Sequence, residues 1–107
     1  NLQEAEELIE RALELDPDNG AYLDSLGWVY FKMGRLDDAI ARLERAAELL
    51  DSDPVIFDHL GEAYLKRRDV ERARRSWQRA LELEPNDAIQ DKLNQLMSHE
   101  PVGAPTE

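Results

Sequence analysis

Apolar residues recur along this chain at the spacing of amphipathic helices. Positions 23, 26, 27 and 30 hold Leu, Leu, Gly and Tyr, and this i, i+3, i+4, i+7 pattern places them on one side of a helix. A second segment follows the same rule over Leu36, Ala39, Ile40, Leu43, Ala47 and Leu50. The pattern returns over Phe57, Leu60, Gly61 and Tyr64, and then over Val70, Ala73, Trp77, Ala80 and Leu81. The spacing therefore predicts an all-α protein built from pairs of helices.

The two helix pairs are related by a constant offset of 34 residues. Residues that match at this offset are Leu26 and Leu60, Gly27 and Gly61, Tyr30 and Tyr64, Ala39 and Ala73, Leu43 and Trp77, and Ala46 and Ala80. The same offset extends backwards to Ala5, Ile9 and Ala12. Self-similarity at a fixed period indicates a repeat architecture, in which each unit buries its apolar face against its neighbours.

Small residues and turn residues fit stacked helical hairpins. Gly27 and Gly61 allow two helices to approach closely, and a larger side chain there would cost roughly 1–3 kcal/mol. Gly34 favours the left-handed backbone that ends many helices. Arg68 holds the equivalent place in the next unit, where a left-handed backbone would cost about 1 kcal/mol. Asp53 is predicted to cap a helix, and Asn19 to be either a cap or a linker residue.

These motifs closely resemble the tetratricopeptide repeat, whose units are about 34 residues long. The residues that carry the resemblance are Leu23, Leu26, Gly27, Tyr30, Ala39, Leu43 and Ala46 in one unit, and Phe57, Leu60, Gly61, Tyr64, Ala73, Trp77, Ala80 and Pro85 in the next. Leu23 and Phe57 replace the tryptophan usual in the family, and Asp51 stands where proline is common. The resemblance implies an α-solenoid of stacked antiparallel helix pairs that coils into a right-handed superhelix.

The repeat register divides the chain into five segments. Residues 1–17 are expected to hold the second helix of an incomplete upstream repeat, residues 18–53 and 54–87 one repeat each, residues 88–99 a capping helix, and residues 100–107 a disordered tail. The capping helix should bury the apolar stripe Ala88, Ile89, Leu93, Leu96 and Met97. Its other side should face water with Gln90, Asp91, Lys92, Asn94 and Gln95. This organisation suggests the C-terminal end of a longer solenoid. The stretch over residues 22–28 is similar to bacterial tetratricopeptide-repeat proteins.

The predicted helix over residues 2–16 has an apolar face without a hairpin partner. That face consists of Leu2, Ala5, Ile9, Ala12 and Leu13. One explanation is that the natural protein continues upstream and covers it. The alternative is self-association of the chain through this helix, and the sequence leaves both open.

Charge restricts the partners. The 13 basic and 24 acidic side chains give a formal charge of −11, which opposes binding to nucleic acid and to anionic membrane surfaces. No apolar stretch approaches the roughly 20 residues that cross a bilayer, and both cytoplasm and periplasm remain open. Seven bases cluster at Lys66, Arg67, Arg68, Arg72, Arg74, Arg75 and Arg79. Because no aromatic residues interleave them, we interpret them as a solvated convex face with local ion pairs in preference to an acidic-partner site.

Catalytic chemistry finds little support in this sequence. The chain has no cysteine, its histidines are His59 and His99, and it lacks a glycine-rich phosphate loop or a serine elbow. His59 lies near Asp58 and Glu62, but one imidazole with two mobile carboxylates is a poor metal site. His59 is therefore interpreted as a solvated histidine, and the chain as a protein without enzymatic activity, cofactor or metal.

A second stripe on the first helix of each pair is the candidate binding surface. In the tetratricopeptide-repeat family this helix lines the concave groove, so the resemblance makes groove residues of Ala21, Asp24, Trp28, Phe31, Val55, Asp58, Glu62 and Leu65. Trp28 and Phe31 are expected to be apolar anchors for a protein or peptide partner. Packing against the first helix of an upstream repeat is an equal alternative for Trp28, and packing within the stack is favoured for Phe31 and Leu65.

The acidic residues of the same stripe indicate the charge of the partner. Asp24, Asp58 and Glu62 would favour basic residues in a ligand, although an ordinary solvated face is the simpler interpretation. They would repel the C-terminal carboxylate that several family members clamp with lysine and asparagine. The sequence thus predicts a scaffold that receives a peptide with apolar anchors and one or two basic residues.

Overall fold

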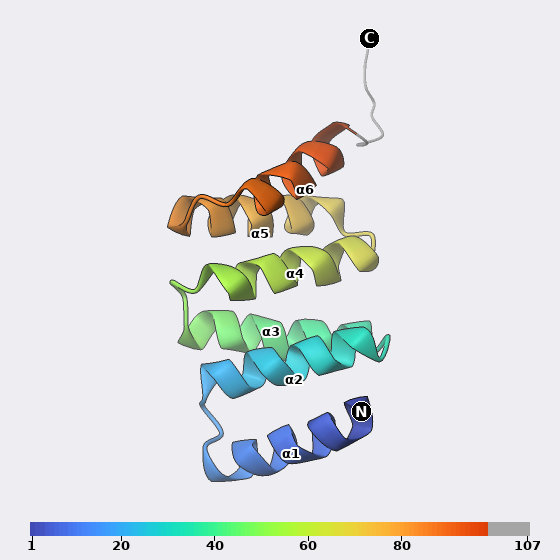
Figure 1. The fold of residues 1–107 in the computed structure, drawn as a ribbon, viewed down its shortest axis with the longest axis vertical. Helices are drawn as coiled ribbons and strands as arrows, with labels where there is room; N and C mark the ends of the chain where they lie inside the picture. The colour runs from blue at the N-terminus through green and yellow to red at the C-terminus, as the bar shows by residue number, and fades with distance from the viewer. Residues whose placement is uncertain (99–107) are drawn as a thin grey trace.

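The computed structural model describes residues 1–98, and within them the chain forms six α-helices and no strand (Figure 1). The helices are α1 (Leu2–Leu15), α2 (Gly20–Lys32), α3 (Leu36–Leu49), α4 (Pro54–Lys66), α5 (Val70–Leu83) and α6 (Asp87–Ser98). The all-α prediction is confirmed. The predicted tail over residues 100–107, and His99, lie outside the described residues.

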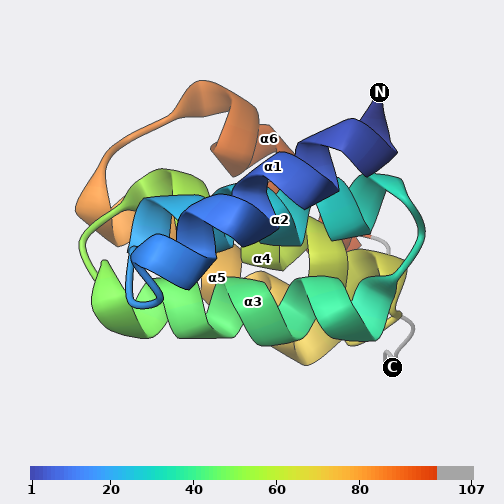
Figure 2. The same cartoon turned by 90° about the horizontal axis from the view of Figure 1, so that it is seen from below.

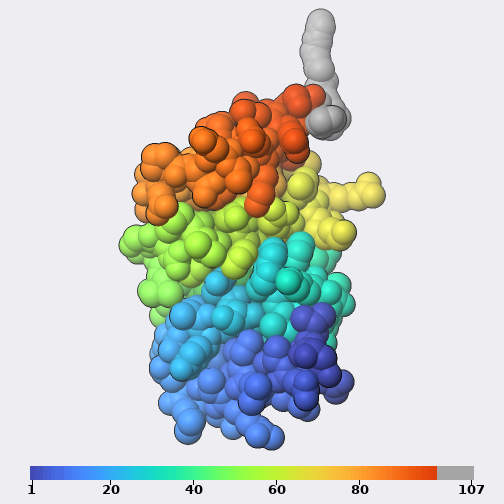
Figure 3. Space-filling view, in the orientation of Figure 1, coloured from blue at the N-terminus to red at the C-terminus, as the bar shows by residue number. Residues whose placement is uncertain are grey.

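Consecutive helices are antiparallel and follow one another in chain order along the long axis of the molecule (Figures 1 and 3). Each helix packs on its neighbours in the chain, and α4 additionally touches α2. Seen from below, α3 lies on one side of α2 and α4, so the first and second helices of the pairs form different faces (Figure 2). The predicted solenoid of stacked helical hairpins is therefore present.

Polar side chains begin the helices where the sequence places them. The Asn19 side-chain oxygen accepts a hydrogen bond from the Tyr22 backbone N–H at 2.9 Å, and Asp53 accepts one from the Val55 N–H at 2.9 Å. Each bond satisfies a backbone donor that has no partner within its helix. The predicted cap at Asp53 is confirmed, and Asn19 is a cap and not a linker residue.

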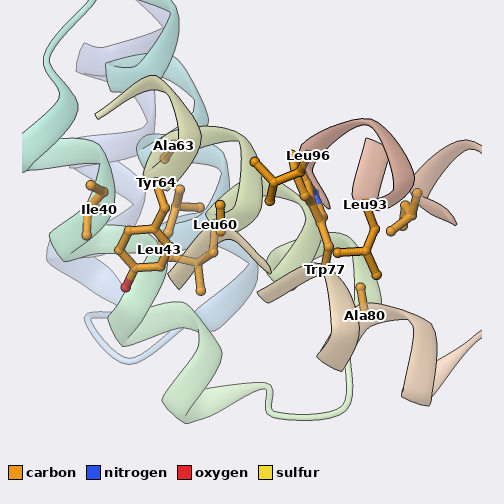
Figure 4. Close-up of a cluster of buried hydrophobic side chains, with 11 residues drawn as sticks. Ile40, Leu43, Leu60, Ala63, Tyr64, Trp77, Ala80, Leu93 and Leu96 are labelled. Atoms are coloured by element: carbon orange, nitrogen blue, oxygen red, sulfur yellow. The ribbon is translucent and has the colours of Figure 1, made fainter. Parts of the chain in front are cut away.

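Glycine allows the helices of each pair to approach closely. A Cβ added at Gly27 would lie 2.7 Å from Leu43 Cγ, and one added at Gly61 would lie 2.3 Å from Trp77 Nε1. Trp77 is 1% exposed and packs in the cluster that joins α5 to Leu93 and Leu96 of α6 (Figure 4). The absence of a side chain at these glycines thus makes room for the largest side chains of the core.

The turns inside the two hairpins have the same backbone form although their residues differ. Gly34 has φ = 81° and Arg68 has φ = 70°, both in the left-handed region. The non-glycine residue carries a conformational cost of about 1 kcal/mol that glycine avoids. The strain predicted at Arg68 is therefore present.

Helix α6 buries a narrower stripe than predicted. Ile89, Leu93 and Leu96 are buried, whereas Ala88 and Met97 are exposed, so the prediction for these two residues was wrong. The reason is that α6 packs mainly on α5, and one neighbour covers fewer positions around a helix than two. In the 34-residue register, Asn94 and Gln95 take the places of Leu60 and Gly61. Polar residues thus stand where the preceding repeat has a core leucine and the glycine of a close helix contact.

Helix α1 is covered on one side. Ile9 and Leu13 pack against the cluster around Leu26 of α2, but α1 has no fully buried residue. Ala5, Ile9 and Ala12 are partly exposed, whereas their equivalents in α3, Ala39, Leu43 and Ala46, are 0% exposed. In α3, the first helix of the same pair, α2, helps to bury these three positions, whereas α1 has no such partner among the described residues.

We predict that Gly61→Ala destabilises the protein. The added methyl group forces the Trp77 indole to move, at a cost of roughly 1–3 kcal/mol, which exceeds the gain of about 1 kcal/mol in helix propensity. Urea unfolding followed by circular dichroism measures the loss.

A double-mutant cycle with Trp77→Leu provides the control. Because leucine lacks the indole atoms that the new Cβ approaches, Gly61→Ala should cost less in that background. Equal stability of Gly61→Ala and the wild type would contradict the contact.

Candidate functional site

The eight predicted groove residues lie on the two first helices. Helix α2 carries Ala21, Asp24, Trp28 and Phe31, and α4 carries Val55, Asp58, Glu62 and Leu65. On each helix they follow a spacing of three or four residues, beside the stripe that enters the core. We call the surface formed by these eight residues the α2–α4 face.

Trp28 is part of a stack of rings that joins α2 to α4. Its ring lies 4.6 Å from that of Phe31 and 4.2 Å from that of His59, with interplanar angles of 7° and 19°. Trp28 therefore packs against the first helix of the next repeat. Phe31 packs on the main core, which agrees with the packing role favoured for it.

His59 is held in this joint and is not solvated. Its side chain is 19% exposed, and its Nδ1 lies 2.7 Å from the Asp24 side-chain oxygen. Because a carboxylate only accepts hydrogen bonds, Nδ1–H of the imidazole is the donor. The prediction of a solvated histidine was wrong, because helix periodicity does not reveal that the Trp28 ring of α2 stacks on His59.

Asp58 and Glu62 are bound by residues from α5 and α6. The Trp77 indole N–H donates to Asp58 Oδ1 at 2.9 Å. Lys92 Nζ lies 2.9 Å from the same oxygen and 2.7 Å from Glu62 Oε2. Lys92 was expected to face water on the polar side of α6. That prediction was wrong, because its ammonium pairs with two carboxylates of α4.

These contacts raise the pH at which Lys92 loses its charge. Burial by itself lowers the pKa of Lys92, but the hydrogen bonds to Glu62 and Asp58 outweigh it and raise the pKa above its ordinary value. The ammonium is therefore the form that the folded protein favours.

Asp24 and Asp58 hold equivalent positions in the repeat and each is bound across to the next unit. The two aspartates are 34 residues apart, and each is bound by a side chain of a later helix: Asp24 by His59 of α4, at an offset of 35 residues, and Asp58 by Lys92 of α6, at an offset of 34. We call these two links the aspartate ladder. Lys92 could have been identified as a residue of this face by continuing the 34-residue register from Asp24 and Asp58. The role of His59 could not, because position 59 lies one residue outside that register.

With the acids already paired, exposed apolar side chains form the accessible part of the face. Val55 is 51% exposed and Leu65 39%. The packing role favoured for Leu65 was therefore wrong, because the last turn of α4 leaves its side chain at the surface. Leu65 borders an open cavity of ≈ 350 Å³ between α4 and α6, lined also by Glu62, Trp77, Lys92, Gln95 and Leu96. Sequence reasoning missed the last four, because they come from helices outside the predicted stripe.

Neither a metal site nor a membrane span is found among the described residues. Among residues 1–98, no group of three or more His, Asp or Glu side chains comes together in a way that could hold a metal ion. In the same part of the chain, none of the helices has the length and apolar character needed to span a membrane.

Comparison with protein families gives two matches, both to models described as tetratricopeptide repeat, over residues 1–58 and 54–87. A TPR repeat-containing protein of Pseudomonas aeruginosa is 53% identical over 36 residues. That match covers 34% of this chain and 6% of the relative, so the chain spans only a small part of that protein.

Solved structures share the fold at low identity. The first TPR domain of Spaghetti (RPAP3), bound to an HSP90 peptide, has a TM-score of 0.87 at 23% identity, over 91% of this chain and 78% of that one. The Yersinia enterocolitica type III secretion translocator chaperone SycD has a TM-score of 0.86 at 20% identity, over 91% and 72%. At this identity the likeness shows the fold alone.

We predict that Lys92→Met destabilises the protein at neutral pH by up to about 1 kcal/mol, a value limited by solvent screening of this partly exposed group. A raised pKa means that the stabilisation is present below the ordinary lysine pKa of about 10.4 and is lost as pH rises through the folded-state value. The gap between the variant and the wild type should therefore close at strongly alkaline pH in urea unfolding.

The matched control is Lys66→Met, which removes the same charge from an exposed position at the end of α4. In buffer of physiological ionic strength it should cost only a few tenths of a kcal/mol, from its charge in the last turn of α4. A loss equal to that of Lys92→Met would show that net charge, and not the aspartate ladder, determines the effect.

Proposed function

Since this chain belongs to the tetratricopeptide repeat family, whose members are protein-interaction modules, we propose that its α2–α4 face binds a peptide segment of a partner protein. The mechanism is rigid presentation. Stacked hairpins hold the face in one shape, so little conformational entropy is lost by the scaffold when the peptide binds.

The observation that carries the proposal is the apolar cavity beside Leu65. Its volume of ≈ 350 Å³ and its lining of Leu65, Trp77 and Leu96 suit one large apolar side chain. The exposed Val55 extends the apolar surface along α4. Such a side chain would bury Leu65 and act as the principal anchor of the peptide.

The charges beside the cavity favour a basic residue next to that anchor. Asp58 and Glu62 contribute −2 and Lys92 contributes +1, which leaves −1 at the cavity mouth. An arginine or lysine of the peptide could share the two carboxylates with Lys92. A terminal carboxylate would face these acids and Asp24, so we expect an internal segment of the partner and not its C-terminus.

The stacked rings define the remainder of the proposed site. Trp28 and Phe31 are held by their contacts with each other and with His59. They serve as a fixed apolar wall that the peptide contacts without displacing a ring. This retains the predicted anchoring role of Trp28 while assigning the deeper pocket to residues of α4, α5 and α6.

We predict that peptides selected on this chain from a random display library share an apolar residue beside a basic one. Binding measured by calorimetry should weaken at least about tenfold in Leu65→Glu and in Val55→Glu, because each places a charge on the apolar contact surface. Trp28→Ala should weaken it as well.

Met97→Glu is the matched control, since Met97 is equally exposed but does not line the cavity. Unchanged affinity in Leu65→Glu together with lost affinity in Met97→Glu would exclude the α2–α4 face as the binding site.

Self-association through α1 is a second candidate function. Leu8 is 66% exposed and Leu15 91%, and neither belongs to the face that packs on α2. A second copy that covered α1 would bury these leucines together with the partly exposed Ala5 and Ala12.

Sedimentation velocity over a range of concentrations tests this candidate. We expect a concentration-dependent dimer that Leu8→Glu and Leu15→Glu abolish, because the new carboxylates would be buried in the contact. A strictly monomeric wild-type chain would remove the candidate.

A further inference from the structure

The structure brings basic and aromatic residues together on a different side of α4. An open cavity of ≈ 380 Å³ between α4 and α5 is lined by Phe57, Leu60, Tyr64, Arg72, Arg75 and Arg79. We call these six residues the arginine cleft. None of them belongs to the α2–α4 face, so the cleft is a separate surface of the solenoid.

The three arginines follow one stripe of α5. Residues 72, 75 and 79 are spaced by three and four, which places them on the same side of the helix. Their side chains are 60%, 65% and 46% exposed. Three positive charges therefore stand along one wall of the cavity within reach of a ligand.

Their ion pairs within the chain are loose. Arg72 Nε lies 3.7 Å from Asp69, Arg75 Nε lies 3.5 Å from Glu71, and Arg79 lies 3.3 Å from Glu82. These distances are longer than those of a charge-assisted hydrogen bond, which are about 2.7–2.9 Å. Exposed pairs of this kind contribute little to folding, so a ligand carboxylate can replace them at small cost.

The opposite wall of the cleft is apolar and aromatic. Leu60 and Tyr64 are buried core residues whose surfaces reach the cavity, and the Arg79 guanidinium lies 5.8 Å from the centre of the Phe57 ring. The sequence showed no aromatic residues among the bases because these rings come from the preceding helix. A ligand here meets an apolar floor and a cationic rim.

The repeat itself does not require arginine at these positions. The equivalents of Arg72, Arg75 and Arg79 one repeat earlier are Asp38, Ala41 and Arg45. Their charges sum to zero, against +3 in the cleft, although both helices occupy the same place in their hairpins. The arginines are thus a property of this one surface and not of hairpin packing.

We propose that the arginine cleft binds an acidic peptide segment of a partner protein, with carboxylates on the three arginines and one apolar side chain against Phe57 and Leu60. Arginine pairs carboxylates through two parallel N–H groups, which gives both orientation and affinity. The net charge of −11 disfavours nucleic acid, whose phosphates extend far beyond the cleft, whereas a short acidic segment is screened from the distant acids. The chain would then hold two peptides of opposite charge on two faces.

The test uses the whole chain and a fluorescein-labelled hexapeptide, Glu-Glu-Phe-Leu-Glu-Asp, followed by fluorescence anisotropy. We expect saturable binding that weakens with added salt and drops at least about tenfold in the double variant Arg72→Gln, Arg75→Gln. The same peptide with glutamine and asparagine in place of its acids should not bind, and alanine in place of Phe and Leu should weaken binding.

Two variants locate the binding surface. Arg68→Gln removes one charge of the same cluster outside the cleft and should bind within about twofold of the wild type. Leu65→Glu, on the α2–α4 face, should also bind normally, which separates this proposal from the proposed function. Circular dichroism confirms that each variant is folded, as expected for exposed side chains.

Three results would overturn the proposal. The first is the absence of saturable binding. The second is equal affinity in the wild type and the double arginine variant, which would place the peptide elsewhere. The third is displacement of the peptide by an RNA homopolymer or by inorganic phosphate as readily as by unlabelled peptide, which would show a phosphate site.

Discussion

In each helix pair, a glycine of the first helix lies against a large side chain of the second, and the stacking of the molecule depends on this contact. Gly27 meets Leu43 and Gly61 meets Trp77, at distances that leave no space for even one methyl group. The close approach fixes the position of Trp77, whose indole N–H then reaches Asp58 and whose ring supports Leu93 and Leu96. A packing constraint in the core thereby positions a polar group on the α2–α4 face and the last described helix beside it.

The aspartate ladder explains why the first-helix face is less acidic than its residues imply. Asp24 of α2 is bound to His59 of α4, and Asp58 of α4 is bound to Lys92 of α6. Each bond crosses from one unit to the next, so the same contacts that reduce the charge of the face also tie the stack together. What a ligand meets is then mainly apolar, at Val55 and at the cavity beside Leu65.

The two faces of the solenoid differ because repeat packing constrains some positions and leaves others free. The core positions keep small and large residues in the same order through both units, whereas the outer positions of the second helices change from Asp38, Ala41 and Arg45 to three arginines. Such freedom permits one short scaffold to present an apolar, weakly acidic face and a basic cleft. Surface chemistry of this kind can change without altering the fold.

The sequence by itself determined the helices, their pairing, their caps and their order, since periodicity of apolar residues and the 34-residue repeat act locally or between neighbours. It also identified the stripe that contains Asp24, Trp28, Asp58 and Glu62. Only the tertiary structure decided that His59 is covered, that Lys92 turns back to α4, and that Phe57 lies among arginines of α5. The reason is physical: pattern reveals which side of a helix is buried, whereas the partners of a polar side chain depend on which helices meet and how far long side chains reach across the space between them.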